Sequence, residues 1–239
     1  MISHLFHAAF YNPIYNALVA LVAYLPGGDV GLAVIILTCA IQAILFPFTL
    51  SAARTQALMK NLEAKLKALK EEHKGDKDKE ALATLELYRA EKVNPFASIL
   101  TLFVQLPILL ALYWVFRYEP FPTLDHARLY SFTPLPHTIS LALFGFLSIA
   151  GTSIVFALIA GATQYVLATL TPTPAAPGGQ GDFAKVLNMQ MKYVFPALIA
   201  VIAYSTSTAI SIYFITNNLI RAGQQLYINR KYGSASNQS

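Results

Sequence analysis

Apolar residues in this chain are gathered into long blocks separated by polar stretches. A helix that crosses a bilayer needs roughly 20 apolar residues, and five blocks are interpreted as such helices. The fourth block is short, which tilting or a locally thinned bilayer accommodates. The predicted spans are residues 31–50, 96–116, 152–170, 193–204 and 207–221. The pattern predicts an all-α polytopic membrane protein with five transmembrane helices, in which residues 1–239 form one domain.

Two apolar stretches do not fit a simple span. Residues 138–170 are too many for one upright helix and too few for two helices with a loop, so 138–150 is interpreted as a surface-lying segment before Gly151. Residues 14–26 have apolar positions at helical spacing after Pro13. This N-terminal segment, residues 1–30, either lies in the interface or crosses the membrane, and the sequence leaves both open.

The polar stretch 51–93 predicts a helical hairpin. A narrow leucine stripe with helical spacing runs along its first half, an interruption "HKGDKD" follows at 73–78, and apolar spacing then resumes. Each arm has roughly 20 residues, or ~30 Å of helix. The hairpin is either a solvated linker or a paddle that contacts a client chain or the translation machinery. The Pro- and Gly-rich stretch 171–182 predicts a flexible loop.

Composition and charge support the membrane class and set an orientation. Hydrophobic residues make up 56% of the chain and charged residues 12%, against about 25% charged in soluble domains. Residues 51–93 hold ten of the seventeen Lys and Arg, and the tail 222–239 holds two more without an acid. Basic loops stay in the cytoplasm, which predicts a cytoplasmic hairpin and tail, an outer N-terminus and location in the inner or plasma membrane. We expect no cleavable signal peptide.

The residue types inside the predicted spans argue against several classes of function. Inside them the sequence holds no Asp, Glu, Lys, Arg or His apart from Arg221, at the boundary between the last span and the tail. Ion-coupled transporters and proton relays normally need such groups. No phosphate-binding loop motif occurs. We therefore expect no catalytic residue, metal or cofactor, and no enzyme activity. The net charge of +5 suits anionic lipid rather than a specific nucleic acid.

The spans do hold neutral polar residues at helical spacing. Thr38 and Gln42 are four residues apart on the first span, and Gln105 shares a face with two hydroxyl residues on the second. Further hydroxyl and amide groups lie on the third and fifth spans: Thr163, Gln164, Ser207, Ser211 and Asn218. Two interpretations remain open from spacing alone. The residues either form hydrogen bonds between helices or line a shared water-accessible groove.

Longer motifs add a resemblance to a known family. The stretch "YRAEKVNPFASILTLFVQLPILLALYWVF" at 88–116, with its Lys-Val-Asn-Pro block, resembles the entry to a core span in the YidC-type membrane protein insertase family. "GDVGLAVIILTCAIQAILFPFT" resembles that family's first core span, and "LTPTP" at 170–174 the end of its third. The stretch from 191 to 233 resembles the last two spans and the tail. The likeness covers roughly residues 11–233, in the short form without a large extracytoplasmic domain.

The resemblance implies a fold, a function and partners. Members insert small membrane proteins and help them fold, without nucleotide, alone or beside the Sec translocon. Five helices enclose a hydrophilic groove open to the cytoplasm and lipid, with nascent membrane proteins as clients. The candidate groove residues are Gln42, Thr38, Gln105, Gln164, Ser211 and Tyr213. The candidate client, ribosome or anionic-lipid contacts are Lys65, Lys67, Lys70, Arg221, Arg230 and Lys231.

Three features depart from the family pattern. The groove Arg that the family usually carries falls on Gln42, the tyrosine pair of the fifth span is Tyr213-Phe214, and the Pro-Ser-Gly turn before that pair reads Ser207-Thr208-Ala209. A fixed cation attracts acidic client segments, whereas an amide only forms hydrogen bonds, so we expect a groove that works without charge attraction and a shifted client set. The alternatives are a small passive channel with a neutral polar pore and an assembly scaffold without insertase activity.

Overall fold

The computed structural model describes residues 2–91, 97–118, 121–171, 186 and 189–232. Its longer elements are helices α1 (Ile2–Phe6), α2 (Asn12–Tyr24), α3 (Val30–Asn61), α4 (Glu63–Glu72), α5 (Lys77–Ala90), α6 (Ala97–Tyr118), α7 (Ile154–Leu170), α9 (Phe195–Ser205) and α10 (Thr208–Tyr232). Short helical turns η1 (His7–Tyr11), η2 (Pro26–Gly28), η3 (His126–Arg128) and η4 (Gln190–Val194) and strands β1 (Ala142–Leu143) and β2 (Leu147–Ser148) complete it. The predicted all-helical character is therefore confirmed, apart from one small hairpin of two strands.

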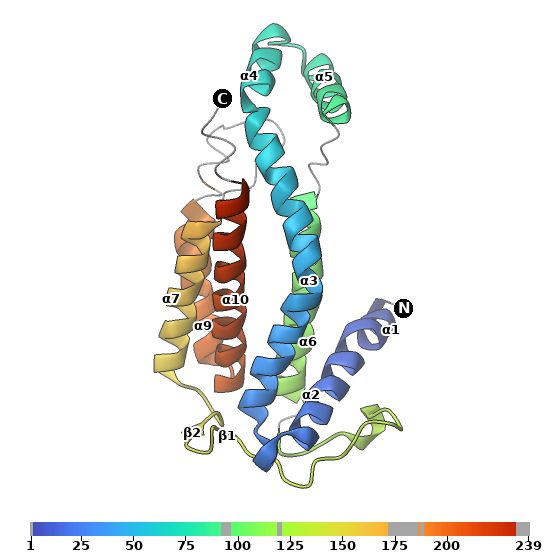
Figure 1. Ribbon diagram of the computed structural model, residues 1–239, viewed down its shortest axis with the longest axis vertical. Coiled ribbons are helices and arrows are strands. Elements are labelled where there is room, and N and C mark those ends of the chain that lie inside the picture. The colour runs from blue at the N-terminus through green and yellow to red at the C-terminus, as the bar shows by residue number, and fades with distance from the viewer. Residues whose placement is uncertain (1, 92–96, 119–120, 172–185, 187–188, 233–239) are drawn as a thin grey trace.

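The long helices form a bundle with two distinct ends. Helix α7 packs against α9 and α10, α10 packs against α3, and α3 packs against α6 and α2 (Figure 1). Helices α4 and α5 project from one end, called here the arm end, at the top of the figure. Residues 121–153 cover the other, called here the loop end. The chain thus places one surface of each long helix toward a shared interior.

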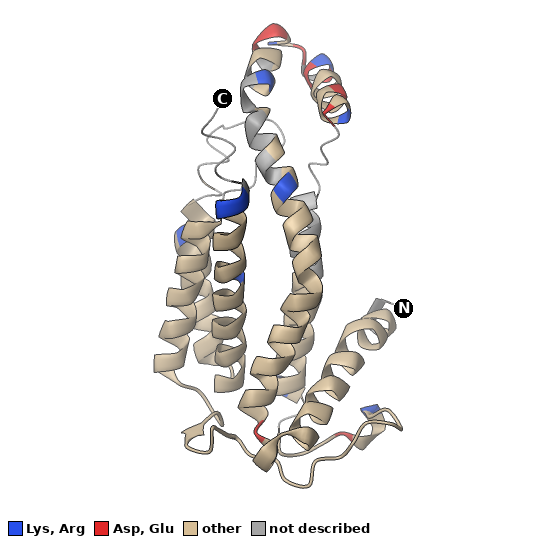
Figure 2. Cartoon of the chain, in the orientation of Figure 1, with Lys and Arg blue, Asp and Glu red and all other residues tan. Residues whose placement is uncertain are grey.

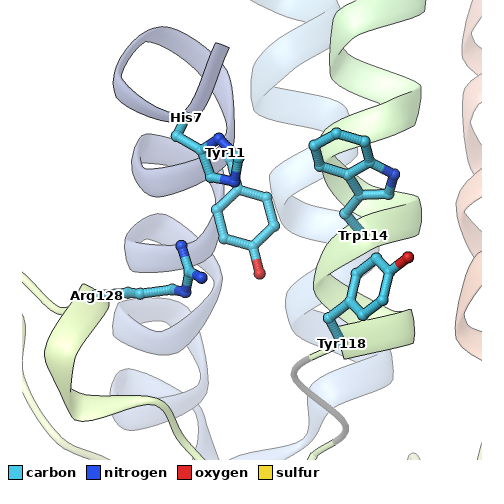
Figure 3. Close-up of a pocket in the computed structure, with 5 residues that line it drawn as sticks. All are labelled: His7, Tyr11, Trp114, Tyr118 and Arg128. Carbon is cyan, nitrogen blue, oxygen red and sulfur yellow. The ribbon is translucent and has the colours of Figure 1, made fainter. Parts of the chain in front are cut away.

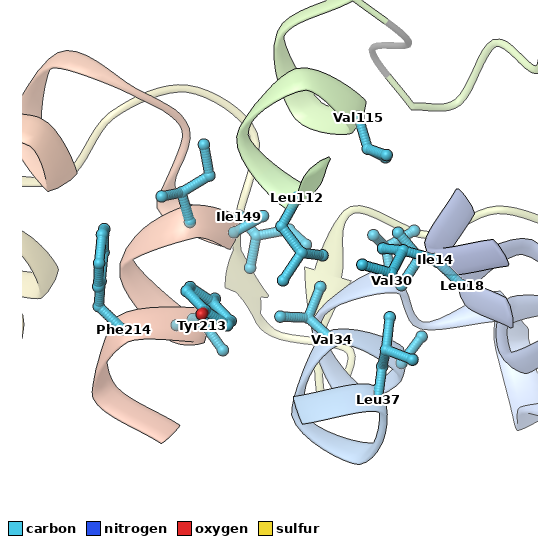
Figure 4. Close-up of a cluster of buried hydrophobic side chains, with 14 of the residues drawn as sticks. Ile14, Leu18, Val30, Val34, Leu37, Leu112, Val115, Ile149, Tyr213 and Phe214 are labelled. Atoms are coloured by element: carbon cyan, nitrogen blue, oxygen red, sulfur yellow. The ribbon is translucent and has the colours of Figure 1, made fainter. Parts of the chain in front are cut away.

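Residues 138–150, interpreted from the sequence as a surface-lying segment, contribute two side chains to the core at the loop end, and their position relative to a membrane stays a prediction. Leu143 and Ile149 are 5% and 2% exposed, and Ile149 lies among the core side chains of α3, α6 and α10 (Figure 4). The reason is the β1–β2 turn, which points alternate apolar side chains inward. The Asp29 carboxylate fixes this turn to the start of α3, because it accepts hydrogen bonds from the backbone amides of Leu32 and Phe144 at 2.9 and 2.7 Å.

Two helices extend beyond the bounds of the predicted membrane spans. Helix α3 runs 32 residues from Val30 to Asn61 without a break at residue 50, although Pro47 lies inside it. Residues 51–61 contain no Gly or Pro and many good helix formers, so nothing in the sequence stops the helix there. Helix α10 continues through Gly223 to Tyr232 and places Arg221 inside a helix.

Helices α4 and α5 meet through a few contacts across a turn. Gly75 has a φ of +101°, and the Asp76 carboxylate caps α5 by accepting a hydrogen bond from the Lys79 amide at 3.1 Å. That amide and the Lys79 ammonium hold the pKa of the Asp76 carboxyl below its usual value. Leu62 packs against Tyr88. The chain therefore turns within the predicted interruption at 73–78.

Two helical stretches of the described residues are long and apolar enough to be candidate membrane spans. They are the stretches His4–Tyr24 and Val30–Thr55, and Ile154–Leu170 is a shorter apolar helix. The N-terminal stretch, for which the sequence left two placements open, is thus long and apolar enough to cross. Charged residues gather in α4 and α5 and near helix ends, and the middle of the bundle is almost free of them (Figure 2). The five-span arrangement stays a prediction.

Candidate functional site

Three helices bring polar side chains together inside the bundle. The amide of Gln42 on α3 donates hydrogen bonds to the side-chain oxygens of Asn217 on α10 and, at 3.4 Å, of Gln105 on α6. The Gln105 amide donates to the Tyr213 hydroxyl at 2.7 Å and lies 3.5 Å from the Asn217 oxygen. These four residues are called the polar cluster. They connect the predicted first, second and fifth spans.

The cluster lies deep within the bundle. Gln42 is 3% exposed, Asn217 5% and Tyr213 2%, while Gln105 is partly exposed. Counted along each helix from the loop end, the four residues lie about 8–20 Å from it at 1.5 Å per residue. A bilayer core is about 30 Å thick. In a membrane, the cluster would therefore place amide and hydroxyl groups away from both surfaces.

The other three candidate groove residues do not join this cluster. Thr38 is buried one turn from Gln42, but its hydroxyl donates to the Val34 carbonyl of its own helix at 2.7 Å. The Ser211 hydroxyl donates to the Ala203 carbonyl of α9 at 3.2 Å. Gln164 is partly exposed on α7 and has no hydrogen bond within the part of the chain that the structure describes. The structure therefore brings three of the six candidates together.

Asn217 is the member of the cluster that the sequence-based interpretation missed. The residue chosen instead was Asn218, whose amide faces α7 and lies 3.3 Å from the Thr163 hydroxyl. The useful signal was the spacing of Tyr213 and Asn217, which are four residues apart and so share one helical face. Adjacent residues on a helix point about 100° apart, so the neighbouring asparagines serve two different interfaces.

The candidate basic contact residues have different surroundings. Lys65 is exposed and pairs with Glu91 at 2.6 Å. Arg230 and Lys231 are exposed at the arm end of α10, and the side chains of Lys67 and Lys70 lie outside the described residues. Arg221 is only partly exposed within α10.

A separate aromatic pocket, which was not predicted from the sequence, lies near the loop end. Side chains from η1, α6 and η3 line a cavity of about 220 Å³ (Figure 3). Its lining residues are His7, Tyr11, Trp114, Tyr118 and Arg128. Arg128 lies 5.2 Å from the Tyr11 ring centre and pairs with Asp125 at 2.9 Å, so its charge is already balanced.

The chemistry available at the polar cluster is hydrogen bonding. Its members carry no ionisable carboxylate, imidazole or thiol, and no group of metal-ligating side chains occurs among the described residues. One amide beside the cluster is incompletely satisfied: Gln224 donates to the Gln42 backbone carbonyl at 3.3 Å, while its own side-chain oxygen is buried without a partner. The site therefore retains hydrogen-bonding capacity.

Apolar helices around a buried amide cluster, with charge kept near the ends, define the class of helical membrane proteins. Residues 22–235 match the family described as 60Kd inner membrane protein, and the chain belongs to that family. Among curated relatives named membrane protein insertase YidC, that of Ectopseudomonas mendocina is 32% identical over 87% of this chain and 32% of its own length. That of Fusobacterium nucleatum is 32% identical over 91% of this chain and 98% of its own length. The chain thus spans about a third of the first relative and nearly all of the second.

The Tyr213 hydroxyl provides a direct test of the cluster. We expect Tyr213→Phe to lower the free energy of unfolding by about 1 kcal/mol, because the Gln105 amide loses its acceptor at 2.7 Å. Tyr204→Phe, at a side chain 52% exposed on α9, should change it much less. Thermal unfolding of both variants in mild detergent measures the difference, and equal effects would contradict the assigned hydrogen bond.

Proposed function

We propose that this protein is a membrane protein insertase and chaperone that integrates small clients through a polar groove centred on Gln42, Gln105, Tyr213 and Asn217, without nucleotide. The observation that carries the proposal is the polar cluster itself, in a chain of a family whose curated relatives are named insertases. Five spans, an outer N-terminus, a cytoplasmic tail and a cytoplasmic helical hairpin at 51–93, called here the arm, complete the proposed arrangement.

The physical rationale is the cost of moving polar groups through lipid. A charged side chain at the bilayer centre costs about 2.5–3.5 kcal/mol on insertion scales. Amide and hydroxyl groups partway across the membrane shorten the apolar path of a client's polar segment, while burial of its apolar helix in lipid drives integration. Gln105 is partly exposed and gives the cluster an accessible member.

The arm is proposed as the first contact for clients. Leu58, Leu82 and Leu85 are 41%, 64% and 44% exposed on α3 and α5, so apolar surface is available there. Arg230 and Lys231 at the end of α10 are proposed contacts for ribosomes or anionic lipid, and the Sec translocon is a further proposed partner.

Reconstitution tests this function directly. Proteoliposomes that hold only this protein should integrate a short single-span client without nucleotide, measured as protection of its translocated segment from protease. A photoactivatable residue at position 42 or 105 should cross-link to the client during integration. The matched control position is Ile44, two residues further on α3 and 69% exposed.

The two alternative functions predict different results in the same proteoliposomes. If ions cross membranes that contain this protein without a client, and no client is integrated, a passive channel is favoured. Absence of both flux and integration for every client would favour an assembly scaffold.

A further inference from the structure

Arg221 is the one charged residue of α10 before its final three residues. It lies thirteen positions after Thr208, about 20 Å along the helix at 1.5 Å per residue. Gln42 lies about 18 Å from the start of α3 by the same measure. Both helices begin at the loop end, where Thr208 donates to the Gly151 carbonyl. The cation and the amide are therefore at similar depth in the bundle.

Hydrogen bonds on either side of Arg221 show which way its face of α10 is turned. Asn217, four residues before it, accepts from the Gln42 side chain, and Gln224, three residues after it, donates to the Gln42 carbonyl. Positions four before and three after a residue share its face of a helix. Arg221 therefore lies on the side of α10 that faces Gln42 on α3.

Within the part of the chain that the structure describes, the Arg221 guanidinium forms no ion pair and no hydrogen bond, and Tyr213 of the polar cluster lies about two turns toward the loop end on the same helix. Helical side chains lean toward the N-terminus of their helix, which for Arg221 is the direction of the cluster. An unpaired cation in such surroundings is costly unless water or a counter-charge reaches it.

We propose that Arg221 is the anion-binding residue of the polar cluster and pairs with a carboxylate carried by the client segment that enters the groove. This inference rests on the proposed function. A guanidinium presents a planar fork of donors that matches the two oxygens of a carboxylate, and Gln42 and Gln224 supply amides beside it. On this proposal the groove attracts acidic client segments, whereas the sequence predicted a groove without charge attraction. The cation lies on α10, whereas the family usually carries it on the first core span, which is α3 here.

Three clients that differ at one position test the charge preference. The translocated segment carries Asp, Asn or Lys at that position, and integration into proteoliposomes is compared for wild type, Arg221→Gln and Arg221→Glu. We expect Arg221→Gln to reduce integration of the Asp client by about tenfold, the factor that corresponds to about 1.4 kcal/mol, and to leave the Asn client within about twofold. Arg221→Glu should reverse the preference, so that the Lys client exceeds the Asp client.

Controls separate a binding role from a structural one. Arg117→Gln removes the same charge from an exposed position at the loop end of α6 and should leave all three clients unchanged. Arg221→Lys should retain part of the preference. Equal loss for all three clients with Arg221→Gln, or no loss for any, would overturn the assignment. Repeating the comparison in liposomes without anionic lipid distinguishes a lipid phosphate: a preference that disappears there would also overturn it.

Peptide binding tests the anion site separately from client integration. Labelled peptides with the Asp and Asn segments are titrated against the purified protein in detergent. Tighter binding of the Asp peptide that is lost in Arg221→Gln supports the anion site even if no client is integrated, in which case only the insertase proposal fails. Equal binding of both peptides by wild type contradicts the anion site even if integration succeeds.

Discussion

Gln42→Arg is expected to destabilise the protein by about 3 kcal/mol or more. Gln42 is 3% exposed, and its neighbours on α10 bracket Arg221, so the new guanidinium would enter a buried site close to an existing one. An uncompensated buried charge typically costs about 3–5 kcal/mol, and a like charge adds repulsion. Thermal unfolding in detergent should show a large loss.

Two further variants test whether the positive charge of Arg221 contributes to the loss of stability in Gln42→Arg. The double variant Gln42→Arg with Arg221→Gln keeps one cation in the cluster and should recover most of the lost stability. Gln42→Glu places an acid beside Arg221 and should be tolerated better than Gln42→Arg, although both replace the same amide. If Gln42→Glu proves as damaging as Gln42→Arg, Arg221 does not influence this position.

Gly28→Ala is expected to be the most damaging of the conservative changes at the loop end. Gly28 has a φ of +65°, and a Cβ there would lie 1.9 Å from the Thr138 carbonyl oxygen. Relief of that overlap separates Gly28 from residues 138–140 and breaks the bond from the Ser140 amide to the Gly28 carbonyl, now 2.8 Å. A positive φ alone costs about 1–3 kcal/mol, and the lost hydrogen bond about 1 kcal/mol more.

Gly27→Ala is the matched control, because it shares the conformation without the contact. Gly27 has a φ of +70°, and a Cβ there meets nothing within 4 Å. We therefore expect Gly27→Ala to cost only the backbone strain and Gly28→Ala to lower the yield of folded protein much further. Thermal unfolding and the monodisperse fraction after purification measure both, and equal losses would show that the close approach to Thr138 is unimportant.

Local sequence signals predicted some elements well and left others out. The third predicted span, 152–170, agrees with α7 at Ile154–Leu170, since Gly151 and the Ser153 cap define its start. The turn at 73–78 followed from Gly75 and clustered charge. The packing of residues 138–150 against α3 was not predictable, because it depends on Asp29, which is more than 100 residues away in sequence.

The polar cluster was half predictable for a similar reason. Periodicity within one helix selected Gln42 and Gln105 but could not tell which face of α10 would meet them, so Asn218 was chosen in place of Asn217. Helix length had a larger consequence. With the last span ended at 221, Arg221 was interpreted as a client or ribosome contact at the start of the tail, whereas α10 continues to Tyr232 and places Arg221 within the helix.

Pro47 removes one backbone hydrogen bond from the middle of α3. It lies between Gln42 and the arm, and proline lacks the amide that would bond the carbonyl of Ala43, four residues earlier. The segment below this joint is anchored in the core through Val30, Val34 and Leu37, while the segment above leads to α4. Bending of α3 at Pro47 would therefore change the position of α4 and α5 without moving the segment that holds Gln42.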